Sequence, residues 1–145
     1  MLKLDFPSFE FKLKRRDNKI FIFDILRKKM FLLTPEEWVR QHVVHFLVSI
    51  KKIPAILIGI EKKIIINKMT KRFDLVVFDN NGNVKLLVEC KAPSIKVDQK
   101  VFDQTTIYNK YLNSEYLMIT NGLSHLYFKS INSSKSYTFM KDFPL

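Results

Sequence analysis

Three charged side chains interrupt two apolar segments near the middle of the sequence. Asp74 lies in RFDLVVFD (72–79), and Glu89 and Lys91 lie at the end of VKLLVECK (84–91). Because side chains alternate along a β-strand, Glu89 and Lys91 share one face of the second segment. Carboxylates are the ligands that hard divalent metal ions prefer, so these residue types on apolar strands indicate a metal site.

The link between the two segments, Asn-Asn-Gly-Asn (80–83), predicts a β-hairpin. A two-residue turn or a four-residue loop sets Asp74 directly opposite Glu89, with Cβ atoms about 5 Å apart. A three- or five-residue loop breaks this pairing. Facing like charges destabilise a hairpin unless a cation or a proton lies between them, and Mg²⁺ accepts such a pair. The alternative is that both carboxylates face solvent and pair with Arg72 and Lys91.

Two helices are expected to position this hairpin. Thr34, Pro35 and Glu37 predict a helix start, with Thr34 as N-cap, Pro35 in the first turn and Glu37 as the far member of a capping box. Apolar residues then recur at helical spacing to about Ile50. A second helix is expected over 98–112.

The remaining apolar segments predict short strands, two of them joined by a turn at 15–19 into an N-terminal hairpin. A break or bulge is expected near Gly59. The order is β-hairpin, α, βββ, α, ββ(β), which predicts an α/β protein of the α+β type with a mixed sheet. Besides the central hairpin, strands are expected over 9–13, 20–26, 30–33, 56–66, 116–120, 125–129 and 136–143.

The composition favours a polyanionic partner. Lys and Arg total 25 against 14 acidic residues, which gives a net charge of +11, and seven cations lie between Lys51 and Arg72. Nucleic acid is the first candidate for that partner, and a merely basic surface is the alternative. A single cysteine, Cys90, excludes an internal disulfide and is expected in the core. Without an apolar run that resembles a signal peptide or a membrane span, we expect a cytoplasmic protein that does not contact membranes.

Five stretches together resemble the PD-(D/E)xK nuclease superfamily. More narrowly, they are similar to the N-terminal nuclease domain of type I restriction enzyme R subunits and its stand-alone bacterial relatives. The one departure from the superfamily's name is Phe73, which stands where the name has Pro. The stretches, in order, are TPEEWVRQ (34–41), RFDLVVFD (72–79), LVECKAP (87–93), QTTIY (104–108) and TNG (120–122).

The resemblance implies a fold and a domain plan. It covers roughly residues 30 to 130, and it implies one nuclease-like domain over 1–145. Within that domain it implies a restriction-endonuclease-like core with the order αβββαβ over 34–130 and an N-terminal β-hairpin extension over 1–33.

The resemblance also implies site residues and a cofactor. Asp74 and Glu89 would hold Mg²⁺, with Mn²⁺ as a substitute, and Lys91 would position the attacking water or help to deprotonate it. The activity implied is hydrolysis of DNA phosphodiester bonds.

Three further candidates come from the two helices. Glu36 lies four residues before Arg40 on one helical face, as in similar family members, so Glu36 is preferred to Glu37 as the helical site acid. Gln104 and Tyr108 match the Q-x-x-x-Y element of related nucleases, where it is associated with the active site and DNA.

Two interpretations of function remain open. The first is a Mg²⁺-dependent DNA endonuclease-like domain with a role in restriction and defence or in DNA repair, whose partners are DNA and restriction-system or repair proteins. The second is a non-catalytic module for nucleic-acid binding or assembly that retains the nuclease fold. With only 3 glycines and no glycine-rich phosphate loop, the chain is not expected to use ATP.

Overall fold

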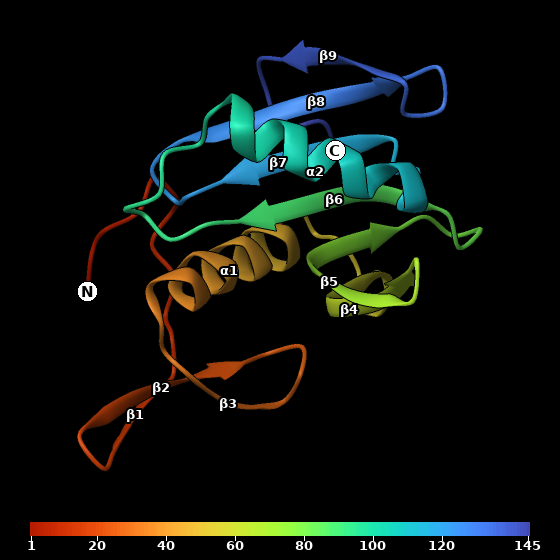
Figure 1. Cartoon of the computed structure of the whole chain (residues 1–145). Helices are drawn as coiled ribbons and strands as arrows, with labels where there is room; N and C mark the ends of the chain where they lie inside the picture. Colours follow the sequence, from red (N-terminus) through yellow and green to blue (C-terminus); the bar gives the residue numbers. More distant parts are fainter.

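A six-stranded mixed sheet with one long helix on each face forms the centre of the molecule, and a small three-stranded sheet lies beside it (Figure 1). The computed structural model describes all 145 residues. The large sheet has the order β4-β5-β6-β7-β8-β9, and only β6 and β7 run parallel. Its strands are β4 (Ile58–Ile66), β5 (Met69–Phe78), β6 (Val84–Cys90), β7 (Tyr116–Thr120), β8 (His125–Ile131) and β9 (Ser136–Met140). The α+β class expected from the sequence is confirmed.

The two helices cover opposite faces of this sheet because side chains alternate along β6. Leu86 and Val88 pack with the helix α1 (Pro35–His45), whereas Leu87 packs in the cluster that contacts α2 (Gln99–Leu112). Cys90 is buried on the α1 face, as expected.

Helix α1 begins as the sequence predicts, with one difference. The Thr34 hydroxyl accepts a hydrogen bond from the Glu37 backbone N–H at 3.0 Å, and Pro35 occupies the first turn. The Thr34 N–H, however, donates to the carbonyl oxygen of Leu32, so the reciprocal half of the expected capping box is absent. Residues 46–50 continue the helix as a π-helical turn, η1 (Phe46–Ile50), so the expected end near Ile50 is confirmed. Helix α2 begins after its N-cap Asp98, also as expected.

The β5–β6 hairpin reaches the expected register by a different route. Its loop has five residues, 79–83, which alone would break the pairing of Asp74 with Glu89. A β-bulge compensates, because Phe78 pairs with Val84 whereas Val77 pairs with Leu86. The register continues to the pair Leu75 and Val88, and one further step sets Asp74 opposite Glu89.

The first strand of the large sheet differs from expectation at its start and at its irregular residue. Residues 55–57 form a short 3-10 turn, η2 (Ala55–Leu57), before β4 begins. Gly59 pairs regularly with Val76, and the irregular residue is Glu61, with a φ of +50°. The expected break near Gly59 is therefore wrong by two residues.

The N-terminal segment forms a three-stranded antiparallel sheet instead of a simple hairpin. Its strands are β1 (Leu13–Arg16), β2 (Lys19–Asp24) and β3 (Lys29–Leu32). The strand expected over 9–13 is wrong, because residues up to Lys12 form no regular element. Instead Leu4 is buried in the main core, and Phe11 packs against Trp38.

Candidate functional site

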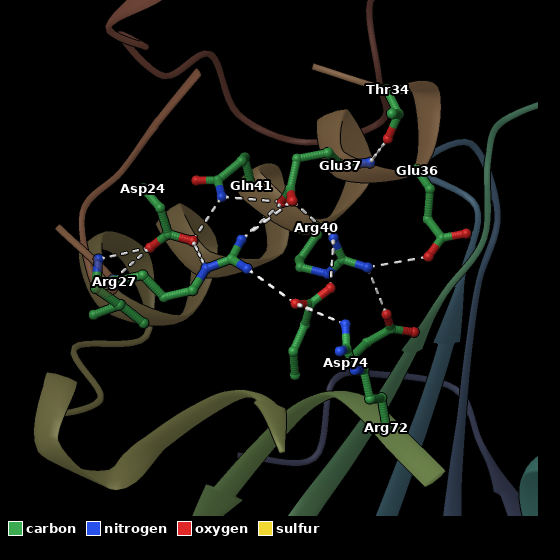
Figure 2. Close-up of polar contacts among 11 residues, drawn as sticks. Asp24, Arg27, Thr34, Glu36, Glu37, Arg40, Gln41, Arg72 and Asp74 are labelled. Atoms are coloured by element: carbon green, nitrogen blue, oxygen red, sulfur yellow. Dashed lines mark hydrogen bonds and ion pairs between the residues drawn. The ribbon is translucent and has the colours of Figure 1, made fainter. Parts of the chain in front are cut away.

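Asp74 lies where three elements meet: α1, β5 and the end of β6. One carboxylate oxygen accepts a hydrogen bond from Nη2 of Arg40 at 2.7 Å. The other accepts one from the backbone N–H of Cys90 at 2.9 Å. The side chain is only 12% exposed. Both oxygens are thus fixed by protein groups, one from the helix and one from the neighbouring strand, and Figure 2 shows the Arg40 contact.

Glu89 is the neighbouring carboxylate, and its charge is disfavoured. Burial, followed by the negative charge of Asp74, raises the pKa of Glu89 to about 7, against the opposing effect of Lys91 and Lys71. The Lys91 Nζ lies 3.4 Å from a Glu89 carboxylate oxygen. The Lys91 backbone N–H donates to the carbonyl oxygen of Thr120 in β7, which anchors the strand end that carries the pair.

The alternative in which both carboxylates face solvent fits only in part. Glu89 does pair with Lys91, but Asp74 pairs with Arg40 and not with Arg72. Arg72 lies instead near Glu61, at 4.0 Å. Neither Asp74 nor Glu89 is an exposed side chain.

Arg40 connects the acids of α1 with Asp74. Its Nη2 donates to Glu36 at 3.0 Å as well as to Asp74, and its Nη1 donates to Glu37 at 2.9 Å. Burial opposes the guanidinium charge, yet Asp74 and Glu37 raise the pKa of Arg40 above its ordinary value overall. Sequence reasoning treated Arg40 only as a helical neighbour of Glu36 and missed this central position.

The structure separates the two glutamates at the start of α1. The Glu37 carboxylate is buried and accepts hydrogen bonds from Arg27, Arg40 and Gln41. Glu36 is 46% exposed, and its only ion-pair partner is Arg40. Burial, followed by the charge of Asp74, raises the pKa of Glu36. Glu36 therefore retains free acceptor capacity beside Asp74, whereas Glu37 is occupied by the protein.

The acids Glu36, Glu37, Asp74 and Glu89, with Arg40 and Lys91, form what we call the acidic cluster. A second arginine, Arg27, joins the N-terminal sheet to this cluster through Glu37 (Figure 2). Arg27 donates to Asp24 at 2.7 Å, to Glu37 at 3.1 Å and to Glu61 of β4 at 3.3 Å. Burial alone would raise the pKa of Asp24, but hydrogen bonds from Arg27, Gln41 and Leu26 lower it overall. Sequence reasoning missed Arg27; the one available signal was an Asp-x-x-Arg pair inside an apolar segment.

The two α2 candidates lie differently with respect to the acids. Tyr108 is half-buried against Phe73, and the Lys71 Nζ lies 4.2 Å from the centre of its ring. Phe73 is the residue that precedes Asp74 in β5, and no hydrogen bond joins Tyr108 to Asp74 or Glu89. Gln104 is exposed on α2, and no hydrogen bond joins it to Asp74 or Glu89. Lys71 is a further cation that sequence reasoning did not assign to the site.

An open cleft of about 500 Å³ borders the cluster. Asp74, Glu89 and Lys91 do not line it directly. No group of three or more His, Cys, Asp or Glu side chains is placed to hold a metal ion. The lining residues come from β3, the start of α1, β4 and the segment after β6: Phe31, Leu32, Thr34, Pro35, Glu36, Glu37, Arg40, Glu61 and Ala92.

Comparison with known families finds a match for most of the chain. Residues 35–144 match the family described as type I restriction enzyme R protein N terminus. The match covers most of the chain, and the chain belongs to this family. Membership indicates a nuclease-related or restriction-system role. No curated protein and no solved structure gave a significant match. None of the helices is long and apolar enough to span a membrane.

Proposed function

We propose that the chain is a Mg²⁺-dependent DNA endonuclease domain of the PD-(D/E)xK type that hydrolyses phosphodiester bonds. The observation that carries this proposal is the pair of adjacent carboxylates, Asp74 and Glu89, with the pKa of Glu89 raised to about 7 by burial and by Asp74. Arg40 and Lys91 offset these negative charges only in part, since the pKa of Glu89 stays raised, and a divalent cation would supply further positive charge. In this proposal residues 34–130 form the nuclease core, residues 1–33 form an extension, and DNA and restriction-system or repair proteins are the partners.

The donor set fits Mg²⁺ more closely than a metal that needs many protein ligands. Mg²⁺ is commonly held by one or two carboxylates, with waters and substrate phosphates completing its coordination. Asp74 and Glu89 supply two carboxylates, and water and substrate phosphate would complete the coordination. When bound, Mg²⁺ or Mn²⁺ would act as a Lewis acid and lower the pKa of a water molecule bound to it.

The chain's own residues have separate tasks in this proposal. Arg40 orients Asp74, because its guanidinium holds one carboxylate oxygen at 2.7 Å. Lys91, 3.4 Å from Glu89, places an ammonium group where negative charge develops on the phosphate, and it orients the attacking water. Glu36 keeps acceptor capacity beside Asp74 and serves as the helical site acid. Tyr108 and Gln104 contact DNA from α2.

The test is nicking of supercoiled DNA in the presence of Mg²⁺ or Mn²⁺. We expect cleavage by the wild type and none by the Asp74→Asn or Lys91→Ala variants. The matched controls are Glu115→Gln and Lys85→Ala, which remove the same charges from a surface ion pair elsewhere. Nicking that survives both site substitutions, or that is lost equally in the controls, contradicts the site assignment.

One observation favours the second candidate function, a binding module without catalysis. Asp74 is already neutralised by Arg40 and by the Cys90 N–H, so it needs no metal to be stable in the fold. Wild-type protein that binds DNA but cuts it with neither Mg²⁺ nor Mn²⁺ would establish this function instead.

A further inference from the structure

The outer part of the β4–β5 hairpin extends past the end of β6. Strand β5 pairs with β6 only from Leu75 to Phe78, whereas its pairing with β4 continues from Lys62 opposite Phe73 to Ile66 opposite Met69. Residues 62–73 are therefore a two-stranded ribbon, which we call the basic ribbon. It closes through a two-residue turn in which both residues, 67 and 68, have positive φ, as tight hairpin turns require.

The basic ribbon carries five cations and no acid: Lys62, Lys63, Lys68, Lys71 and Arg72. Lys63 and Arg72 lie directly opposite each other, and facing like charges destabilise a strand pair. Lys63 and Lys68 form no ion pair, and the nearest carboxylate oxygen to Arg72 is at 4.0 Å. Within the protein most of this positive charge has no close carboxylate partner, so a polyanion would relieve the repulsion.

The two sides of the basic ribbon differ. Ile66 and Phe73 are buried in the cluster that packs on α2, which fixes the ribbon to the body of the protein. On the opposite face, which carries Lys63 and Arg72, Ile65 is 75% exposed. An exposed apolar side chain between cations fits a partner with an anionic backbone and apolar groups between its phosphates, such as the thymine methyl groups of the DNA major groove. A two-stranded β-ribbon also has the width that the DNA major groove admits.

The ribbon begins and ends beside the candidate active site. Asp74 follows its last residue, and Glu61 precedes its first. Lys71 lies over the Tyr108 ring and acts on Glu89, whereas Arg72 lies near Glu61. A backbone held by the ribbon would therefore run toward Asp74 and Glu89.

We propose that the basic ribbon is the DNA-holding element of this protein. It lies in the major groove of double-stranded DNA, with Lys63, Lys68 and Arg72 on phosphates. Ile65, which shares a face with Lys63 and Arg72, lies against the bases. The inference rests on the proposed function for the identity of the partner, but it requires no catalysis.

The test compares two triple variants in a DNA-binding measurement without divalent cations. The first, Lys63→Gln, Lys68→Gln and Arg72→Gln, removes the ribbon charges. The control, Lys129→Gln, Lys135→Gln and Lys141→Gln, removes the same charge from exposed residues at the opposite edge of the sheet, around β8 and β9. Fluorescence anisotropy with a labelled duplex at several salt concentrations gives affinity and its salt dependence. Circular dichroism and unfolding midpoints establish that both variants fold.

Each lost phosphate contact reduces the slope of log affinity against log salt by about 0.9, so we expect the ribbon variant to lose roughly 2 to 3 of that slope. At low salt its affinity should fall at least tenfold, and the control should stay within about twofold of the wild type. Equal losses in both variants, or wild-type binding by the ribbon variant, overturn the proposal, as does a wild type that does not bind duplex DNA. If the wild type binds through the ribbon but never cuts, the ribbon proposal stands and the endonuclease proposal fails.

Discussion

Arg40 is the buried cation that joins the acids of α1 to Asp74 of β5. Its buried guanidinium faces Glu36, Glu37 and Asp74 together, and planar, forked donor geometry suits such sharing better than an ammonium group does. The charge is favourable only because the carboxylates offset the cost of burial. The charges of Glu37 and Asp74 are in turn favourable only because Arg40 offsets the cost of burying them.

Replacing Arg40 with Met should therefore destabilise the protein strongly. Removal of one partner from a buried ion pair typically costs about 3–5 kcal/mol, because the other charge is left uncompensated. Arg40→Lys should cost less, since it keeps the charge but loses the fork. Urea unfolding at neutral pH measures both. In the Arg40→Met background, Asp74→Asn should recover part of the loss; if Arg40→Met costs under about 1 kcal/mol, the guanidinium is not holding these acids.

Residue patterns located the acids of the cluster but not its arginines. Asp74, Glu89 and Lys91 interrupt apolar strands, and that contrast is visible along the chain. Arg27 and Arg40 lie on a turn and on a helix, where a cation is ordinary, and only the folded structure brings them to carboxylates 34 residues away in sequence. Of the two α1 glutamates, Glu36 is preferred because similar family members carry Glu four residues before Arg, and this preference stays a prediction. In the structure Glu36 is 46% exposed and Glu37 is buried.

At the scale of elements, helix caps and helix extents are the features that the sequence predicts well. The N-cap Thr34 and the extent of α2 follow from local hydrogen bonding, which the sequence specifies directly. The register of the β5–β6 hairpin depended instead on two features that cancel, a five-residue loop and a one-residue bulge. Local turn residues do not specify such a bulge, so the correct register was obtained with an incorrect loop.

The small N-terminal sheet is joined to the core through Arg27. The arginine lies after β2, stacks on Phe31 of β3 at 3.5 Å, and pairs with Glu37 of α1 and Glu61 of β4. This sheet lies before the range that matches the family, yet its arginine neutralises an acid that also binds Arg40. We therefore infer that the sheet stabilises the acidic cluster.

A double-mutant cycle tests this coupling. Arg27→Met and Glu37→Gln should each destabilise the protein, and the double variant should cost less than the sum, with a coupling energy of about 1–3 kcal/mol. Urea unfolding of the four proteins gives this value. As a matched comparison, the cycle of Lys85→Met with Glu115→Gln, a surface pair at 2.7 Å, should give under about 1 kcal/mol. A coupling between Arg27 and Glu37 no larger than the surface value would mean that the sheet is attached by apolar packing alone.

At the scale of the whole molecule, buried ionisable groups oppose one another as pH changes. Burial lowers the pKa values of His42 and His45, which pack against the aromatic residues of the N-terminal segment. Their contribution to stability is present above about pH 6.5 and is lost as pH falls below it. Burial and Asp74 raise the pKa of Glu89 from 4.5 to about 7, so its contribution is present below 4.5 and is lost as pH rises to 7. Between about pH 4.5 and 6.5 the two effects have opposite signs.

Replacing Glu89 with Gln should remove the contribution to stability that is lost as pH rises. The variant should approach the wild type as pH falls below about 4.5, where Glu89 becomes protonated in the unfolded as well as the folded state, and should exceed it in stability above pH 7. At about 1.4 kcal/mol per pKa unit, the gain above pH 7 is at most about 3–4 kcal/mol. The variant should also gain stability with pH between 4.5 and 6.5 more steeply than the wild type, because the opposing contribution of Glu89 is removed and that of the histidines remains. Urea unfolding at pH 4.5, 5.5, 6.5 and 8 measures these slopes, with Glu115→Gln as the control; parallel profiles for Glu89→Gln and wild type would show that Glu89 titrates normally in the folded protein.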